Sequence, residues 1–232
     1  MKKDVLIIIP ARSKSKRIKN KNIKNFMGQP MIYYSINNAI KSKIASKIHI
    51  STESIKIKKK IEKEKSLKID FLRPNKLSND KTPIIEVVRF VNNQYILNGF
   101  KYKYIVLLSA CAPLLDKQDL INGINLAKKN KTSYPILSVS KYPSPIEWAL
   151  KKNNNTIQFS TKDYVKNSQS FKEKYYDTGS IAIFKASSLA NISKNKFFKR
   201  FIPLILPKYK AVDIDNIEDW EMAKILYRGL KK

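Results

Sequence analysis

A run of basic and small polar residues, 10–22, directly follows the first apolar stretch of the chain, residues 5–9. The run carries Arg12, Lys16 and Lys21 with serines between them. Arginine supplies forked hydrogen-bond donors and lysine a compact positive charge, while serine hydroxyls and backbone N–H groups supply neutral donors. Such a set suits a polyphosphate, although the same residues would also make a solvated basic loop. The run has neither the ending of a Walker A loop nor the early glycines of a dinucleotide fingerprint.

Two aspartates near the end of the chain, Asp213 and Asp215, flank Ile214. On a strand, alternate residues face the same way, so both carboxylates would point together while Ile214 faces the core. Neighbouring carboxylates repel unless a cation lies between them, and Mg²⁺ binds one or two carboxylates together with phosphate oxygens and water. The pair is therefore a candidate magnesium site. The alternative is that Asp213 is solvated and Asp215 caps the last helix.

Small residues follow another apolar stretch, 104–108, and begin with Ser109. Small side chains at the end of a buried strand let a flat base or a ribose approach the backbone. The only cysteine, Cys111, lies among them and is predicted to be a small buried residue, not a nucleophile.

Two segments, 141–150 and 175–180, mix aromatic residues, carboxylates and turn formers. They would line a sugar pocket, or they are packed turns. The candidate sugar-binding residues in them are Tyr142, Ser144, Glu147, Asp177 and Gly179.

The composition excludes several classes of protein. One histidine and one cysteine in 232 residues exclude a disulfide framework and a Cys/His zinc site, and a Ser-His-Asp triad would have to use His49. No apolar run reaches the roughly 18 residues of a membrane span, and the apolar run near the start is too short for a signal peptide. We therefore expect a cytoplasmic protein with no membrane partner.

The formal net charge is +29. Such a charge favours an anionic partner, and nucleic acid is one possibility. Only six of the 47 basic residues are arginines, however, and the lysines are spread along the chain. Nucleic-acid readers favour arginine for its forked contacts, so we expect a small anionic substrate and no nucleic acid.

The elements that would position these residues alternate between strands and helices, which is the pattern of an α/β fold with a mainly parallel central sheet. The stretch 5–9 is apolar throughout, as a strand covered on both faces must be. A polar segment, 141–176, interrupts the pattern and is predicted to be an excursion from a single domain spanning 1–232. The predicted strands are 5–9, 47–51, 68–72, 104–108, 136–140, 180–184, 204–206 and 211–214. The predicted helices are 30–43 opened by Pro30, 54–65, one with Thr82 as its cap and Pro83 as its first residue, 116–129 and 216–228.

Taken in order, these segments resemble the acylneuraminate cytidylyltransferase family, the CMP-sialic acid synthetases. The opening motif of that family is matched by Pro10, Ala11, Arg12, Ser15, Lys16, Lys21 and Asn22, its middle motif by Leu72, Arg73, Pro74, Leu77 and Asp80, and its closing motif by Asp213, Ile214 and Asp215. Two positions depart from it: Arg17 replaces a glycine, and Ser109 replaces the glutamine expected to help read cytosine. The segments Tyr142–Ile146 and Tyr176–Gly179 are similar to those of the pseudaminic acid branch of the family.

The resemblance implies a Rossmann-like nucleotidyltransferase that depends on Mg²⁺ and forms a homodimer, partly through the excursion. The anomeric hydroxyl of an acidic nine-carbon sugar would attack the α-phosphate of CTP in line, and pyrophosphate would leave. Pseudaminic acid is the favoured sugar, with N-acetylneuraminate and legionaminate as alternatives; a glycosyltransferase and a basic nucleic-acid-binding protein are the rival classes. The implied nucleotide-binding residues are Ala11, Arg12, Ser15, Lys16, Lys21, Asn22, Arg73, Asp80 and Ser109; Arg12, Lys21 and Asp215 would be catalytic, and Asp213 and Asp215 would bind the metal.

Overall fold

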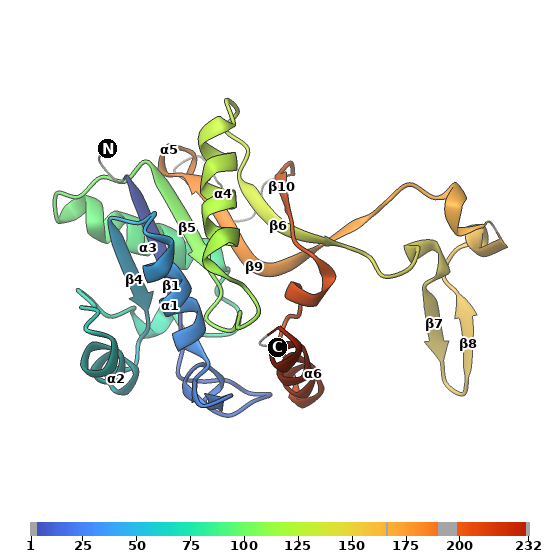
Figure 1. The fold of residues 1–232 in the computed structure, drawn as a ribbon, viewed down its shortest axis with the longest axis horizontal. Coiled ribbons are helices and arrows are strands. Elements are labelled where there is room, and N and C mark those ends of the chain that lie inside the picture. Colours follow the sequence, from blue (N-terminus) through green and yellow to red (C-terminus); the bar gives the residue numbers. More distant parts are fainter. Residues whose placement is uncertain (1–3, 166, 190–198, 231–232) are drawn as a thin grey trace.

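A six-stranded sheet with the strand order β10-β6-β9-β5-β1-β4 forms the centre of the computed structural model, which describes residues 4–165, 167–189 and 199–230 (Figure 1). β1 pairs in parallel with β4 and β5, and β10 pairs in parallel with β6, whereas β9 is antiparallel to both of its neighbours. The prediction of a mainly parallel sheet is confirmed. The strands are β1 (Val5–Pro10), β4 (Lys47–Ser51), β5 (Tyr104–Leu108), β6 (Ile136–Lys141), β9 (Tyr175–Lys185) and β10 (Ile202–Ile205).

Helices cover both faces of the sheet, which explains why β1 is apolar throughout. Val5, Ile7 and Ile9 point to one face, and Leu6 and Ile8 point to the other. The first face packs against α1 (Ile32–Ser42), α2 (Ile55–Lys65) and α4 (Lys117–Lys129); the second packs against α3 (Ile84–Leu97) and the short α5 (Ala186–Leu189).

A third apolar cluster joins the last helix to the beginning of the chain. α6 (Ile217–Gly229) packs against the small hairpin of β2 (Asn25–Phe26) and β3 (Gln29–Pro30), where the rings of Trp220 and Phe26 meet edge to face at 5.2 Å. Ile214 is fully buried in the same cluster. This packing holds the segment before α6 beside the loop that follows β1.

The predicted excursion is an arm that projects from the sheet between β6 and β9 (Figure 1). It carries the hairpin β7 (Leu150–Asn153) and β8 (Thr156–Phe159) and the 3₁₀ turns η3 (Ile146–Trp148), η4 (Lys162–Val165) and η5 (Ser168–Ser170). Further 3₁₀ turns are η1 (Lys21–Ile23), η2 (Asn75–Leu77) and η6 (Lys208–Lys210). The description of the chain as one domain stays a prediction.

Residues 68–72 do not form the predicted strand. The N–H of Ile69 donates to Glu62 Oε1 at 2.9 Å, and Lys58 Nζ donates to the carbonyl oxygen of Ile69 at 2.8 Å. Side chains of α2 therefore satisfy this backbone, and β4 is the edge of the sheet.

Residues 211–214 do not form a strand either, because the chain already turns toward α6. The N–H groups of Asp215 and Asn216 both donate to Asp219 Oδ2, and Asn216 caps the helix by accepting from the N–H of Asp219. The alternative in which Asp215 caps the helix is therefore wrong, and Asp215 is left available to the site.

Two predicted helix starts are also wrong. Pro30 pairs within β3, and α1 begins at Ile32. Thr82 Oγ1 donates to the carbonyl oxygen of Lys76, so it does not cap α3, and Pro83 is extended and precedes the helix. Across the described ranges, no helix has both the length and the apolar character that crossing a bilayer requires.

Candidate active site

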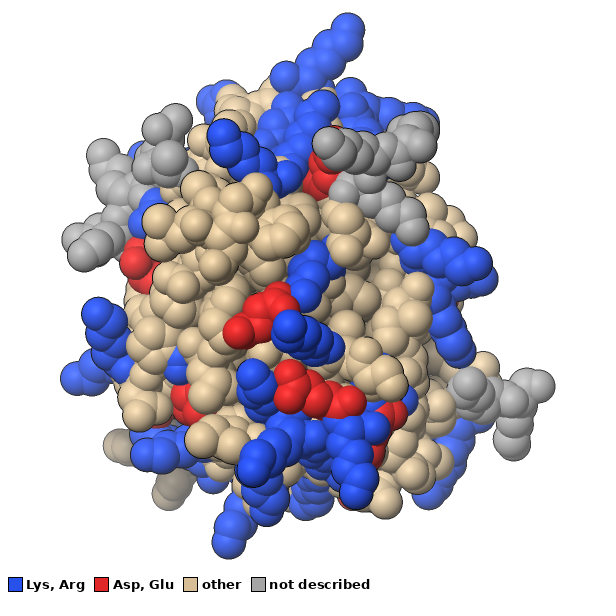
Figure 2. All heavy atoms as spheres, turned by 90° about the vertical axis from the view of Figure 1, so that its left-hand side faces the viewer, with Lys and Arg blue, Asp and Glu red and all other residues tan. Residues whose placement is uncertain are grey.

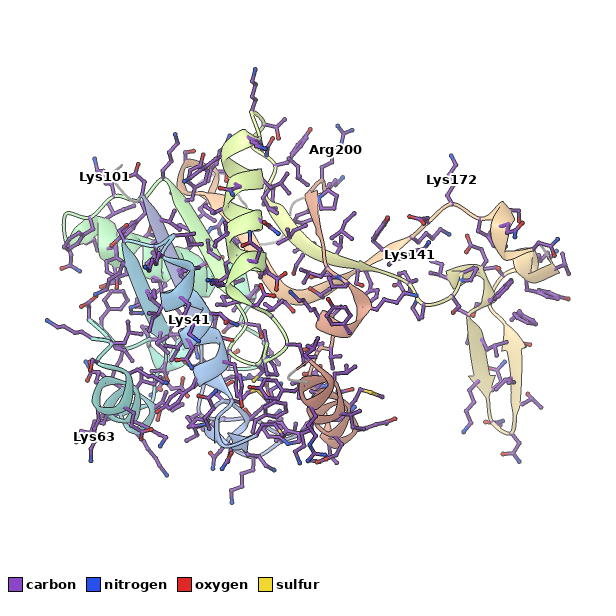
Figure 3. All side chains as sticks on the ribbon, viewed as in Figure 1. Lys41, Lys63, Lys101, Lys141, Lys172 and Arg200 are labelled. Atoms are coloured by element: carbon purple, nitrogen blue, oxygen red, sulfur yellow. The ribbon has the colours of Figure 1, made fainter. Side chains whose placement is uncertain are left out.

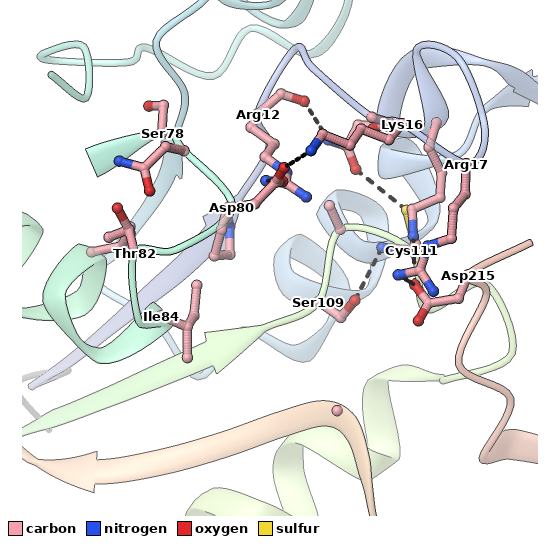
Figure 4. Close-up of a pocket in the computed structure, with 18 of the residues that line it drawn as sticks. Arg12, Lys16, Arg17, Ser78, Asp80, Thr82, Ile84, Ser109, Cys111 and Asp215 are labelled. Atoms are coloured by element: carbon pink, nitrogen blue, oxygen red, sulfur yellow. Dashed lines mark hydrogen bonds and ion pairs between the residues drawn. The ribbon is translucent and has the colours of Figure 1, made fainter. Parts of the chain in front are cut away.

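A cavity of about 380 Å³ lies beyond the carboxyl ends of β1 and β5 (Figure 4). Parallel strands of an α/β sheet place their following loops at this edge, where ligands bind in such folds. Five parts of the chain supply its walls: the loop after β1, several residues between 73 and 87, the end of β5, Gly179 of β9, and the segment before α6. The predicted nucleotide-binding residues that line it are Arg12, Ser15, Lys16, Lys21, Asn22, Arg73, Asp80 and Ser109. Ala11 does not line it, because it is fully buried in the core beneath.

Two of the predicted phosphate-binding cations converge on one carboxylate. Arg12 and Lys16 both form ion pairs with Asp80, the second at 2.6 Å (Figure 4). Hydrogen bonds from Lys16 and Arg12 hold the pKa of Asp80 below its ordinary value. The two cations are therefore already turned toward an anion at the cavity.

Two further cations contact Asp215. Arg17 Nη2 lies 2.9 Å from Asp215 Oδ1, and Lys21 Nζ lies 3.4 Å from the same oxygen. Lys21 Nζ also donates to the carbonyl oxygen of Ile214 at 2.5 Å. The Lys21 side chain is only one-fifth exposed. Its charge therefore lies in the cavity wall, between the loop after β1 and the segment before α6.

Asp213 and Asp215 both line the cavity, although no strand presents them. Burial and the neighbouring Asp215 raise the pKa of Asp213 above its ordinary value, which is how two carboxylates behave when they share a site. Ile214 between them is buried as predicted. Over the described part of the chain, no cluster of three or more His, Cys, Asp or Glu could hold a metal. The pair fits Mg²⁺, which needs only one or two protein carboxylates when phosphate and water complete its coordination.

Gly179 is the predicted sugar-binding residue that the structure brings into this cavity. Its φ of +63° is a left-handed conformation that favours glycine, and a Cβ there would lie 3.9 Å from Asp213 Oδ2. Asp177 does not line the cavity; its Oδ1 accepts from the N–H of Gly179 at 2.8 Å and supports this turn.

The other predicted sugar-binding residues lie elsewhere. Tyr142, Ser144 and Glu147 line a second cavity of about 260 Å³ within the arm, and they do not line the first. Within one chain, the structure therefore separates the predicted phosphate-binding residues from these three.

Sequence reasoning missed part of the cavity wall. Ser78, Asn79 and Thr82 line it next to Asp80, and the motif that identified Asp80 could have drawn attention to its neighbours. Ser109 lines the cavity, and its Oγ accepts from the N–H of Cys111 at 3.2 Å.

Cys111 lines the cavity but is nearly buried. Burial raises the pKa of the Cys111 thiol to about 12, so it is protonated at neutral pH. Its Sγ donates to Asn22 Oδ1, and Asn22 in turn donates to the carbonyl oxygen of Arg12 at 2.8 Å. The thiol thus supports the loop, as suits a buried residue with no nucleophilic role.

The comparisons with known proteins agree with this geometry. Residues 6–231 match the model of the cytidylyltransferase family, and a pseudaminic acid cytidylyltransferase of Campylobacter jejuni is 34% identical over 96% of each chain. The chain belongs to the cytidylyltransferase family, whose members are nucleotidyltransferases.

The names of two other relatives specify different sugars. An N-acylneuraminate cytidylyltransferase of Escherichia coli is 28% identical over 96% of this chain and 52% of its own length. A CMP-N,N'-diacetyllegionaminic acid synthase of Legionella pneumophila is 24% identical over 96% of this chain and 95% of its own. The resemblance read from the motifs is thus confirmed.

A solved structure shares the fold over its whole length. This is the structure of a CMP:2-keto-3-deoxy-manno-octonic acid synthetase complexed with CTP, which superposes with a TM-score of 0.73. The superposition covers 98% of this chain and 99% of the synthetase, and the two sequences are 13% identical. At that identity the likeness shows the fold alone, and it confirms the Rossmann-like nucleotidyltransferase architecture.

Proposed function

We propose that this protein transfers the cytidylyl group of CTP to an acidic nine-carbon sugar, with pseudaminic acid favoured, and releases pyrophosphate. The observation that carries the proposal is the convergence of five cations and three carboxylates on one cavity at the end of β1, in a chain that belongs to the cytidylyltransferase family. The full-length similarity to a pseudaminic acid cytidylyltransferase supports this choice of sugar.

The residues of the loop after β1 hold the triphosphate. Arg12, Lys16 and Lys21 bind its oxygens and neutralise the charge that develops on the leaving pyrophosphate. No protein nucleophile takes part, because the sugar hydroxyl attacks the α-phosphate directly. Catalysis then rests on holding the attacking oxygen, phosphorus and leaving oxygen in line.

Asp213 and Asp215 are the residues that would hold Mg²⁺. When bound, the ion supplies Lewis-acid stabilisation of the phosphoryl oxygens. Lys21 and Arg17 contact Asp215 and fix the direction of its carboxylate. Asp215 thereby links the triphosphate-binding loop to the metal-binding pair.

The nucleoside would occupy the part of the cavity between Arg73 and the end of β5. The small residues 109–112 leave room for a flat base or ribose there. Arg73 is almost fully buried, so its guanidinium is a fixed donor for a base or sugar oxygen. Ser109 Oγ accepts from the N–H of Cys111 and keeps its own O–H, so we propose that this hydroxyl donates to the nucleoside from the cavity wall.

The arm supports a proposal about the assembly. Its cavity is lined by predicted sugar-binding residues that lie apart from the phosphate cavity of their own chain. The arm also exposes Leu150, Ile157 and Phe159 at 50%, 64% and 44%, which favours burial against another surface. We propose a homodimer in which the arm packs on a second copy, so that Tyr142, Ser144 and Glu147 approach the partner's nucleotide.

A nucleic-acid-binding function is not favoured by the distribution of charge. Lys41, Lys63, Lys101, Lys141, Lys172 and Arg200 lie on widely separated parts of the molecule (Figure 3). On the face shown in Figure 2, basic side chains are distributed with acidic ones among them. Because the substrate CTP is a cytoplasmic metabolite, we place the enzyme in the cytoplasm.

The test of the proposed function is a substrate panel. The purified protein is incubated with Mg²⁺ and with CTP, UTP, ATP or GTP, each with and without pseudaminic acid, and pyrophosphate is measured. Release only with CTP and the sugar together is expected. Release with another nucleotide in preference to CTP would contradict the proposal.

A further inference from the structure

Glu53 lies behind the loop that follows β1 and lines neither the phosphate cavity nor the arm cavity. Its side chain is 11% exposed. One oxygen, Oε1, accepts from both the backbone N–H and the hydroxyl of Ser13, each at 2.7 Å. The other, Oε2, accepts from Arg73 Nη2 at 3.1 Å. Both oxygens of this carboxylate are thus used inside the protein.

The two partners of Glu53 belong to two segments that form different walls of the cavity, although Ser13 itself does not line it. Ser13 directly follows Arg12 in the loop after β1, whereas Arg73 begins the segment that leads to Asp80. The carboxylate therefore bridges two walls that are far apart in the sequence. Arg12 and Lys16 also join these two segments through exposed ion pairs with Asp80, and Glu53 adds a nearly buried link between them.

Hydrogen bonds at the end of β4 hold the backbone on both sides of Glu53. The N–H of Arg73 donates to the carbonyl oxygen of Thr52 at 2.8 Å, and the N–H of Ser54 donates to Thr52 Oγ1 at 3.1 Å. Thr52 itself is fully buried. Glu53 is consequently fixed between a strand end and the first residue of α2, which limits the positions its carboxylate can take.

The charge of Glu53 matters because Arg73 is buried. The Arg73 side chain is only 4% exposed, and a buried guanidinium needs an anionic partner. Burial raises the pKa of Glu53, but hydrogen bonds from Ser13 and Arg73 outweigh it and bring the pKa below its ordinary value. Glu53 is therefore ionised at neutral pH and balances Arg73.

We propose that Glu53 is a positioning residue for the nucleotide: it fixes the phosphate-binding loop against Arg73 before CTP arrives. This inference rests on the proposed function, because it takes the first cavity to be the CTP site. A loop that is already ordered loses less conformational freedom on binding, so the effect falls on CTP affinity. Glu53 does not touch the substrate and is not a catalytic residue.

The decisive variant is Glu53→Gln, which keeps the size of the side chain. A glutamine has one acceptor oxygen and one donor amide, so it cannot accept from Ser13 and Arg73 at once without facing a donor with a donor. We expect the Kd and KM for CTP to rise about 10- to 100-fold, the range expected from losing a hydrogen bond to a charged group. The KM for the sugar should stay within about twofold, because the sugar makes no contact through this bridge.

A matched control is Glu86→Gln. Glu86 pairs with Arg89 at 2.9 Å on α3, in another partly buried Arg–Glu pair, and it does not line the cavity. Both variants are compared by calorimetry with CTP, by kcat and KM for each substrate, and by thermal unfolding. If Glu53 has only a structural role, Glu53→Gln should behave like Glu86→Gln: its melting temperature falls and its affinity for CTP stays unchanged.

Glu53→Asp and Ser13→Ala keep the inference testable if Glu53→Gln fails to fold. Glu53→Asp retains the charge and should recover part of the CTP affinity. Ser13→Ala removes one of the two hydrogen bonds that Ser13 donates to Glu53, and it should weaken CTP binding by a few fold. Unchanged CTP affinity in folded Glu53→Gln, or in Ser13→Ala, would overturn the positioning role alone. Wild-type protein that neither binds CTP nor releases pyrophosphate from it would overturn the proposed function itself.

Discussion

Lys21 Nζ lies 3.4 Å from Asp215 Oδ1, although 194 residues separate the two in the sequence. This contact joins the loop after β1 to the segment before α6. Arg17 reaches the same oxygen at 2.9 Å, so two cations balance one carboxylate.

Replacing Asp215 with asparagine should abolish most turnover and preserve the fold. The cap of α6 is made by Asn216 and Asp219, so the helix does not depend on the Asp215 carboxylate. A neutral amide binds Mg²⁺ poorly, and losing one charge contact in the transition state costs about 100-fold or more in kcat. The measurement is kcat at saturating Mg²⁺ with thermal unfolding alongside, and Glu221→Gln in the exposed face of α6 is the control. Near-normal kcat in Asp215→Asn would contradict the metal assignment.

Arg12→Ala and Lys21→Ala should each weaken the binding of CTP. Both side chains line the cavity, and each loses a charged contact to a phosphate oxygen, which amounts to about tenfold or more in Kd. Calorimetry with CTP measures the effect. Lys59→Ala is a suitable control, because Lys59 is exposed on α2, whereas its neighbour Lys58 donates to Ile69. If both loop variants bind CTP as the wild type does, the cavity is not a triphosphate site.

The sheet, and the place of the basic loop at a cavity beyond β1, could be predicted from the sequence because their signals are local. The apolar stretch of β1 followed at once by Arg12 and Lys16 defines a strand end with cations beyond it. Asp213 and Asp215 both line the cavity, but no strand alternation presents them there. Ile214 between them is buried in the cluster around Trp220, and this anchors the segment that carries both carboxylates.

Other parts of the site could not be predicted because they depend on tertiary contacts. Nothing near Glu53 in the sequence indicates that it meets Ser13, 40 residues earlier. The predicted strand at 68–72 has the right residue types, but α2 supplies the hydrogen bonds that a neighbouring strand would have supplied. Likewise, Tyr142 and Glu147 follow β6 in the sequence, but the arm carries them away from the cavity beyond β1 and β5.

Cys111 should react slowly with a thiol reagent, and CTP should slow it further. The pKa of the thiol is raised by burial from 9.0 to about 12, which lowers the thiolate fraction near pH 8 by about 1000-fold. Because Cys111 is the only cysteine, labelling with a chromogenic disulfide reports on this cavity alone. The rate is measured with and without saturating CTP, with inorganic sulfate at equal ionic strength as the control. Equal rates with and without CTP would place the nucleotide elsewhere.

The single histidine should make the stability fall as the pH is lowered from 7 to 5.5. Burial lowers the pKa of His49 from 6.5 to about 3, with Asp70 opposing and Lys47 adding to the effect. Between pH 6.5 and 3, His49 therefore binds a proton in the unfolded state but not in the folded state. The contribution of neutral His49 to the free energy of unfolding is complete above pH 6.5 and is lost as the pH falls toward 3. Between pH 7 and 5.5 the free energy of unfolding should drop by about 1 kcal/mol from this group.

Urea unfolding of the wild type and of His49→Gln at the two pH values separates this contribution from all others. His49 stacks on Phe71 at 4.4 Å and its Nδ1 lies 3.1 Å from the Tyr95 hydroxyl, so the variant will be less stable at both pH values. Its free energy of unfolding should nevertheless change less between them. An identical pH dependence in the two proteins would show that His49 does not titrate in this way.

The most direct test of the account is a comparison of kcat/KM for pseudaminic acid and N-acetylneuraminic acid with CTP, with the products identified by mass spectrometry. The acids share a carboxylate and an anomeric hydroxyl, but pseudaminic acid ends in a methyl group where the other carries a hydroxymethyl group. Tyr142, Pro143, Pro145 and Ile146 give the arm cavity an apolar lining that suits a methyl group, and an apolar site rejects an added hydroxyl by only about 100-fold. We therefore predict CMP-sugar from both acids, with the higher kcat/KM for pseudaminic acid. A higher value for N-acetylneuraminic acid would contradict the choice of sugar, and the absence of any CMP-sugar from either acid would contradict the proposed reaction.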